Sequence, residues 1–299
     1  MQSRLLTVIL NRAAGADNEG ALRGRIAKIL EEHGIQVEIR TVQGGSGITE
    51  LAKSAVRNGS FAVAAGGGDG TVSAVATALV DSECALGVLP LGTFNHFAKD
   101  LRIPLDVEEA AQTIATGKIR RVDVGEINGK IFVNNSSLGL YPNMVRRREQ
   151  EHRLGRNKWM ALFWVTLAVL RRYPLLVVRL TSRDGQQLIR RTPVVFIGNN
   201  QYELKGFEIG SRPLLDGGML AIYVAHQDRP ATLIRMGVEA VLGRLHRGVD
   251  FDFLSTENLQ IEATRRTMQV ATDGEVSTFA PPLLYRIRPL ALRVIVPVV

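Results

Sequence analysis

The chain has 299 residues, 45% of them hydrophobic and 22% charged, so it is long enough for two packed domains and its composition excludes global disorder. The net charge of +8 indicates an anionic partner, but sparse aromatic residues and the lack of zinc-ligand spacing argue against nucleic acid. Cys84 is the only cysteine, which excludes an internal disulfide and fits a reducing compartment such as the cytoplasm.

Strands and helices alternate in the first part of the chain. Apolar runs predict strands at residues 5–10, 37–42, 61–64 and 86–89. The spacing of apolar residues predicts helices at residues 19–33, 48–58 and 72–80. This alternation predicts an α/β domain over residues 1–121, built on a parallel sheet with helices on both faces.

Closely spaced strands replace this pattern after residue 121. Asn128-Gly129 joins two strands within residues 121–133 and is a strong β-hairpin signal. Further strands are predicted at residues 175–181, 188–191, 194–198, 220–224, 258–263, 269–271 and 292–296, and helices at residues 158–172 and 230–245. Residues 122–299 are therefore predicted to form a mainly antiparallel, sandwich-like β domain, whose last residues are free to pack back on the first domain.

A glycine-rich stretch, residues 66–71, joins the third predicted strand to its helix. Glycine permits positive φ and leaves no side chain between the backbone and a ligand, so such a loop can fold its amides around an anion. The stretch lacks the Lys-Ser/Thr of a Walker loop and the spacing of a dinucleotide fingerprint. A tight turn without a ligand is the alternative, but three consecutive glycines favour a phosphate-binding loop.

Small, hydroxyl and amide side chains follow each of the first four predicted strands. They lie in residues 11–15, at Thr41, in residues 66–71 and in residues 91–98. Ligands of open α/β sheets bind outside the carboxyl ends of the strands. A nucleotide fits this set, because its phosphates need N–H donors and its ribose needs hydroxyls and amides.

Seven short motifs along the chain resemble those of the diacylglycerol kinase catalytic-domain family, which includes sphingosine kinases and bacterial lipid kinases. They are Asn11 to Gly15 (with Arg12 in place of the usual proline), Gly67-Gly68-Asp69-Gly70-Thr71, Gly92-Thr93-x-Asn95, Val122-Asp123-Val124-Gly125, Gly198-Asn199-Asn200, Leu215-Asp216-Gly217-Gly218-Met219-Leu220 and Asp273-Gly274-Glu275. Gly-Gly-Asp-Gly alone is shared with NAD kinases, but seven motifs in the family's order are specific.

The resemblance implies transfer of the ATP γ-phosphoryl group to the hydroxyl of a lipid alcohol such as diacylglycerol, and so a place in phospholipid biosynthesis. It assigns Glu275 as the general base and Asp69 as a second catalytic residue. The nucleotide contacts that it implies are Asn11, Gly15, Thr41, Gly66, Gly67, Gly68, Asp69, Gly70, Thr71, Thr93 and Asn95.

The resemblance also implies two uses of Mg²⁺. Asp216 matches the ligand of a structural ion, with the carbonyls of Pro213 and Gly218 as companions. A catalytic ion would arrive with ATP, and Asp69 and Asp123 are candidates to hold it through water. Without the resemblance, Asp123 would be interpreted as a structural acid, and the Asp216 and Asp273 stretches as simple turns.

His96 departs from the family pattern, because many members have Asp at this position. Either the acidic network relies on Asp69 and Asp123, or the preferred substrate differs, or activity is weak; a histidine that only packs is the simpler alternative. Two other functions stay open: a kinase of a soluble substrate, as in NAD kinases, and a nucleotide- or lipid-binding protein with weak or no catalysis.

A basic and apolar segment, Arg146–Arg172, suggests contact with an anionic membrane. Its apolar part, residues 159–170, would rise about 18 Å as a helix, which is too short for a bilayer core of roughly 30 Å. It is either a core helix or an interfacial helix flanked by arginines. We therefore expect a cytoplasmic protein that touches the membrane peripherally; a homodimer is left open.

Overall fold

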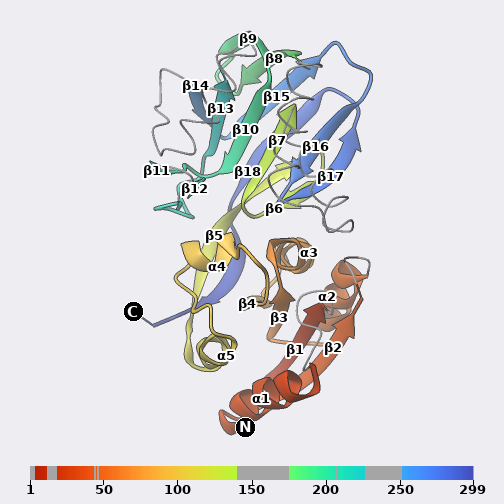
Figure 1. Ribbon diagram of the computed structural model, residues 1–299, viewed down its shortest axis with the longest axis vertical. Helices are drawn as coiled ribbons and strands as arrows, with labels where there is room; N and C mark the ends of the chain where they lie inside the picture. The colour runs from red at the N-terminus through yellow and green to blue at the C-terminus, as the bar shows by residue number, and fades with distance from the viewer. Residues whose placement is uncertain are drawn as a thin grey trace, which may run out of the picture. The chain divides into compact units, whose positions relative to one another are not determined.

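The computed structural model describes residues 4–11, 19–43, 45, 47–139, 175–205, 208–209, 211–225 and 251–298. The chain divides into two compact units (Figure 1). The first contains Met1–Val124 and Arg288–Val299, and the second contains Gly125–Ile287. Gly15, Arg12 and the segments predicted at residues 146–172 and 230–245 lie outside the described residues.

The first unit is a parallel sheet of order β2-β1-β3-β4. Its strands are β1 (Arg4–Asn11), β2 (Ile35–Val42), β3 (Ala62–Gly67) and β4 (Ala85–Pro90), and its helices are α1 (Glu19–Glu32), α2 (Ile48–Arg57), α3 (Asp69–Leu79), α4 (His96–Asp100) and α5 (Val107–Thr116). Helix α1 packs against α5 and helix α2 against α3 (Figure 1). The predicted α/β architecture is confirmed.

Helix α3 begins three residues earlier than the sequence predicts. Asp69, Gly70 and Thr71 form its first turn, and Gly68 is its N-cap residue with extended backbone. The second half of the glycine-rich stretch is thus helical. This matters for ligand binding, because the N–H groups of a first helical turn have no acceptor within the helix.

Helices α4 and α5 were missed by the sequence prediction. The signal for α5 was present, because the Asp106 carboxylate accepts hydrogen bonds from the N–H groups of Glu108 (2.9 Å) and Glu109 (3.0 Å). An Asp followed three residues later by Glu is a helix-start pattern. The five residues of α4 are too few for periodicity to be recognised.

The second unit is a β-sandwich, as predicted. Strands β5 (Lys118–Ile127) and β6 (Lys130–Phe132) form the predicted hairpin, with positive φ at both Asn128 and Gly129. One sheet has the order β14-β13-β10-β7-β16-β17, and in the other β18 pairs with β15, β15 with β8, and β8 with β9. Apolar side chains from both sheets, such as Leu138, Ile197 and Ile261, are buried together between them.

The remaining strands of this unit are β7 (Asn135–Gly139), β8 (Leu176–Ser182), β9 (Gln187–Thr192), β10 (Val194–Asn199), β11 (Leu204–Lys205), β12 (Glu208–Ile209), β13 (Leu220–Ala225), β14 (Phe251–Thr256), β15 (Asn258–Ala263), β16 (Met268–Thr272), β17 (Glu275–Phe279) and β18 (Leu283–Val296). The sequence prediction missed five short strands, which are β7, β11, β12, β14 and β17.

Strand β18 is much longer than the predicted 292–296, since it runs over 14 residues. Its first part pairs antiparallel with β15, whereas Val294 pairs in parallel with Leu86 of β4. Pro289 and Leu290, whose φ is +52°, lie between the two parts. The sequence prediction missed the first part of β18 because a proline lies inside the strand, and proline usually ends a strand.

Among the residues that the structure describes, no helix is long and apolar enough to cross a membrane.

Candidate functional site

The carboxyl ends of four neighbouring parallel strands form one edge of the first unit. Leu10 of β1 pairs with Thr41 of β2 on one side and with Gly66 of β3 on the other. Gly67 of β3 pairs with Pro90 of β4. Asn11, the glycine-rich stretch and the loop after Pro90 therefore leave the sheet at the same edge. This is where α/β sheets bind ligands.

Close approach, rather than positive φ, explains the glycines at this edge. A Cβ atom on Gly67 would lie 2.3 Å from Thr71 Oγ1, and one on Gly92 would lie 2.3 Å from the Cα atom of Gly68. A Cβ on Gly66 would lie 2.3 Å from Leu10 Cδ2. None of the glycines between residues 66 and 70 is among those with positive φ, so that part of the sequence argument was wrong.

Asp69 connects the glycine-rich stretch to the next loop. Its carboxylate oxygens accept hydrogen bonds from the backbone N–H groups of His96 (3.3 Å) and Phe97 (3.2 Å). The two loops also meet at Gly68 and Gly92. The residues of two predicted motifs therefore form one packed arrangement.

Asn95 shapes its own loop. Its backbone is left-handed, with φ of +51°. Its side-chain amide accepts a hydrogen bond from Gly92 N–H (3.0 Å) and donates to the carbonyls of Gly92 (2.8 Å) and Pro90 (3.4 Å). Thr93 is exposed within this loop. Of the two residues that the sequence assigns to nucleotide binding here, Thr93 is the accessible one.

Asn11 and Thr71 join the end of β1 to the start of α3. The side-chain amide of Asn11 donates to Thr71 Oγ1 over 3.2 Å, and Thr71 is buried. Thr41 lies half-buried near the end of β2. These three residues lie at the predicted edge of the sheet.

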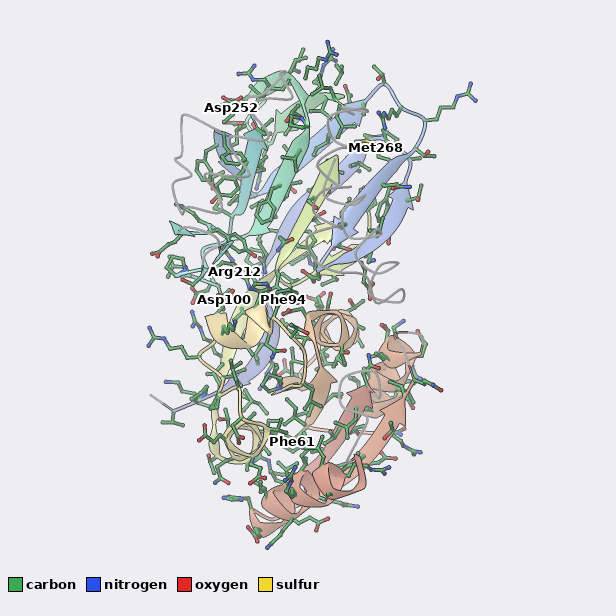
Figure 2. The ribbon with its side chains drawn as sticks, viewed as in Figure 1. Phe61, Phe94, Asp100, Arg212, Asp252 and Met268 are labelled. Atoms are coloured by element: carbon green, nitrogen blue, oxygen red, sulfur yellow. The ribbon has the colours of Figure 1, made fainter. Side chains whose placement is uncertain are left out.

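His96 is the first residue of α4; it is exposed and stacks on Phe94, which is labelled in Figure 2 and lies two residues earlier. The two ring centroids are 5.6 Å apart and the planes differ by 7°. Asp123, by contrast, is buried, and its carboxylate accepts a hydrogen bond of 2.8 Å from Leu290 N–H. Asp123 thus supports the bend in β18, which is the structural role that the sequence left open.

In the second unit, Glu275 is the first residue of β17 and directly follows a tight turn. Asp273 (φ +48°) and Gly274 (φ +86°) form the turn between β16 and β17. The Glu275 side chain is 57% exposed and lies 3.5 Å from Lys130 Nζ, which itself donates to Ser277 Oγ. Its carboxylate is accessible to a substrate hydroxyl.

Asp216 lies in the loop before β13. It is exposed, and the backbone turns at Gly218, where φ is +68°. Within the described ranges, no three His, Cys, Asp or Glu side chains gather as a metal cluster. A cation at this loop would rest on one carboxylate with carbonyl oxygens and water, which is a donor set that Mg²⁺ accepts.

Sequence reasoning missed the polar residues that hold this unit together beside the Asp273 turn. Asp273 accepts hydrogen bonds from three consecutive backbone N–H groups, those of residues 133–135. Arg212 is buried and donates to the carbonyls of Val133 (2.6 Å) and Asn199 (3.1 Å). An arginine beside a proline gives no sign in the sequence that it is buried.

A parallel α/β unit with glycine loops at the strand ends, followed by a β-sandwich that carries exposed carboxylates, defines a two-domain protein whose first unit is suited to binding an anionic ligand such as a nucleotide. Comparison with protein families gives the particular family. Residues 5–127 match the model of the diacylglycerol kinase catalytic domain, and residues 139–296 match that of the YegS C-terminal NAD kinase beta sandwich-like domain. The chain belongs to the diacylglycerol kinase catalytic-domain family and is an ATP-dependent lipid kinase.

Individual proteins agree with this assignment. The diacylglycerol kinase of Bacillus subtilis (strain 168) is 25% identical over 280 residues, which cover 92% of this chain and 90% of that protein. A protein of Pseudomonas savastanoi pv. phaseolicola named "Probable lipid kinase YegS-like" is 29% identical over 273 residues, or 89% and 86% of the two chains. A crystal structure of a diacylglycerol kinase from Bacillus anthracis str. Sterne has the same fold, with a TM-score of 0.73, 20% identity and coverage of 99% and 98%.

Proposed function

We propose that this lipid kinase phosphorylates a lipid alcohol such as diacylglycerol, with the first unit binding ATP and the second supplying the general base and the lipid site. The observation that carries the nucleotide assignment is the packed pair of loops at the carboxyl edge of the sheet. Their contact leaves no room for a side chain at Gly92, where an added Cβ would lie 2.3 Å from the Cα atom of Gly68. Backbone N–H groups at such an edge suit phosphate oxygens.

Different residues of the predicted nucleotide site have different tasks in this proposal. The first turn of α3, including Gly70, and the exposed Thr93 contact phosphate oxygens, and the positive end of the α3 dipole adds to the attraction. Asn11, Thr41 and Gly15 are the proposed contacts for the parts of the nucleotide other than its phosphates. Gly66, Gly67, Thr71 and Asn95 hold the loops in shape, as their contacts suggest.

Glu275 is the proposed general base. The lipid hydroxyl oxygen forms a bond to the γ-phosphorus of ATP while the bond from that phosphorus to the β,γ-bridging oxygen breaks. The hydroxyl proton passes to the Glu275 carboxylate and ADP leaves. The exposure of this carboxylate supports the assignment, since the base must reach a substrate bound from outside.

Mg²⁺ would neutralise charge on the transferring phosphate when bound. Asp69 is the proposed residue for positioning this ion through water, with Asp123 as a second candidate. A separate structural ion is proposed at Asp216 with the carbonyls of Pro213 and Gly218. The positive φ of Gly218 supports this, because it turns the backbone two residues after Asp216.

The location of the protein is part of the same proposal. A water-insoluble acceptor requires contact with a bilayer, so we propose a cytoplasmic enzyme that binds anionic membranes peripherally. The basic segment Arg146–Arg172 is the proposed contact. Weaker sedimentation with anionic liposomes after charge reversal of its arginines would support this, and unchanged sedimentation would contradict it. Analytical ultracentrifugation of the full chain would test the homodimer.

The deciding experiment uses labelled ATP, Mg²⁺ and a panel of acceptors that includes diacylglycerol, other lipid alcohols and NAD. We expect transfer to a lipid alcohol, and a fall in kcat of about 100-fold or more for Glu275→Gln. Phosphoryl transfer to NAD alone would establish the alternative of a kinase with a soluble substrate. The match of the second domain to an NAD kinase beta sandwich-like domain is the reason to test NAD. ATP binding without transfer to any acceptor would indicate a binding protein.

A further inference from the structure

Residues 133–135 lead from β6 to the first residue of β7, and side chains from three distant parts of the second unit hold them. One carboxylate satisfies their N–H groups: Asp273 accepts from Val133 (2.8 Å), Asn134 (2.8 Å) and Asn135 (3.1 Å). The Asp273 N–H group donates in return to the Asn135 carbonyl over 2.9 Å. A carboxylate that receives several backbone N–H bonds is firmly fixed.

The carbonyl groups of the same segment are satisfied by other side chains. The Val133 carbonyl accepts from Arg212 Nη1 (2.6 Å) and Asn199 Nδ2 (2.8 Å). The Asn134 carbonyl accepts from Tyr202 Oη (3.0 Å), and Asn134 Oδ1 accepts from Arg212 Nη2 (2.8 Å). Buried polar groups with this many partners are rigid, because each lost bond leaves an unsatisfied neighbour.

This network, which we call the 133–135 clamp (residues 133–135, Asn199, Tyr202, Arg212 and Asp273), links the turn that precedes Glu275 to the segment that leads to Asp216. Asp273 lies two residues before Glu275, in the same turn. Arg212 lies four residues before Asp216.

The Asp216 loop is held to the clamp a second time, through the residue after Asn199. Asn200 N–H donates to the Met219 carbonyl over 3.1 Å. A Cβ on Gly217 would lie 2.8 Å from Asn200 Oδ1, so the loop backbone packs directly on this amide.

We propose that Arg212 and Asp273 are positioning residues, which use the 133–135 clamp to fix the Glu275 turn relative to the Asp216 loop. This inference rests on the proposed role of Glu275 as the base. Neither residue touches the substrate in this scheme. Arg212 is suited to the task because its planar guanidinium holds several N–H donors in a fixed geometry, whereas the three donors of a lysine sit on one flexible ammonium group.

The kinetic test uses Arg212→Met, Asp273→Asn and Glu275→Gln in the full chain, with diacylglycerol in mixed micelles. Arg179→Met is the matched control, since Arg179 is an exposed arginine of the same unit. A misplaced base should lower kcat by about 100-fold in both clamp variants. The KM for ATP and for lipid should stay within about threefold, because binding groups are untouched. Arg212→Lys should recover little of the lost kcat. The control Arg179→Met should keep the wild-type kcat.

A double-mutant cycle separates positioning from general damage. If Arg212 acts through Glu275, then Arg212→Met combined with Glu275→Gln should be no slower than Glu275→Gln alone. Additive losses would overturn the inference. Tyr202→Phe removes only the hydroxyl that bonds Asn134 and should act in the same direction more weakly, so it serves if Arg212→Met does not fold.

Amide hydrogen exchange tests the clamp without any activity. Exchange in the β16–β17 turn should rise by at least about tenfold in Arg212→Met and Asp273→Asn, and stay unchanged in Arg179→Met. Unchanged exchange in Arg212→Met would overturn the inference even if the enzyme is slow. Wild-type protein that phosphorylates no lipid would instead refute the proposed function, and the exchange result would still decide whether the clamp fixes the turn.

Discussion

Gly68 and Gly92 belong to different loops, yet a Cβ atom on Gly92 would lie only 2.3 Å from the Cα atom of Gly68. The loops that follow β3 and β4 therefore pack backbone against backbone. Asp69 reinforces this contact by accepting the N–H groups of His96 and Phe97. The proposed phosphate site thus depends on the absence of a side chain at Gly92 and on a tight fit at Gly68, where an added Cβ would lie 3.3 Å from the Cα atom of Gly92.

The first prediction concerns Gly92→Ala. The added Cβ would also lie 2.8 Å from Asn95 Oδ1, so the loops must separate. Overpacking of this kind costs about 1–3 kcal/mol of stability. We expect the Kd for ATP, measured by titration calorimetry, to rise by roughly tenfold or more, which corresponds to about 1.4 kcal/mol.

Gly24→Ala is the matched control for this change. Gly24 lies in α1 with nothing within 4 Å of an added Cβ. Alanine is a better helix former than glycine, so this variant should gain up to about 1 kcal/mol and bind ATP normally. Normal ATP binding by Gly92→Ala would contradict the proposed site.

The second prediction concerns His96→Asp. Because the ring is exposed, its replacement should change stability by no more than about 0.5 kcal/mol. A carboxylate beside Asp69 would add negative charge where Mg²⁺ is proposed to lie. We expect a severalfold higher kcat at limiting Mg²⁺, measured with labelled ATP.

Phe94→Leu is the control, since it removes the stacking partner without adding charge. An equal gain in both variants would indicate that the stacked ring pair, rather than the missing charge, limits the wild-type rate. A lower rate in His96→Asp would show that this chain needs the histidine.

The third prediction concerns Cys84, which is buried beside β4. Burial raises the pKa of its thiol from 9.0 to about 11. The reactive thiolate is therefore scarce at pH 8, and a thiol reagent should label native protein far more slowly than protein in urea. A Cys84→Ala variant that carries Ser255→Cys on the exposed face of β14 provides an accessible thiol for comparison.

The same pKa gives a stability trend with a defined sign. Between about pH 9 and pH 11 the thiol ionises in the unfolded chain but stays protonated in the native one, so the unfolded state is favoured. The contribution of Cys84 is present below pH 9 and is lost as the pH rises toward 11. The difference between wild type and Cys84→Ala in urea unfolding should follow this trend; a constant difference would contradict it.

The fourth prediction concerns the start of α5. Asp106→Ala removes the acceptor for two N–H groups and should cost about 1 kcal/mol in urea unfolding. Asp106→Ser should recover most of this loss, because serine also caps helices. A loss that serine does not recover would mean that the charge of Asp106, rather than its hydrogen bonds, stabilises the helix.

The fold class, the family and several local structures could be predicted from the amino-acid sequence alone. Period changes along the chain separate the α/β unit from the β-sandwich, and Asn128-Gly129 specifies its hairpin. These features could be predicted because they depend on neighbouring residues, whose backbone preferences and spacing are written directly in the chain.

The roles of the polar residues, by contrast, depend on contacts between segments that are distant in the sequence. Asp273 accepts a hydrogen bond from Val133, which is 140 residues away in the sequence. Arg212 donates a hydrogen bond to Val133, which is 79 residues away. Asn95, which the sequence assigns to the ligand, is used within its own loop. The hydrogen-bond partner of a buried polar group depends on which distant segments pack together, and a local sequence pattern does not predict this.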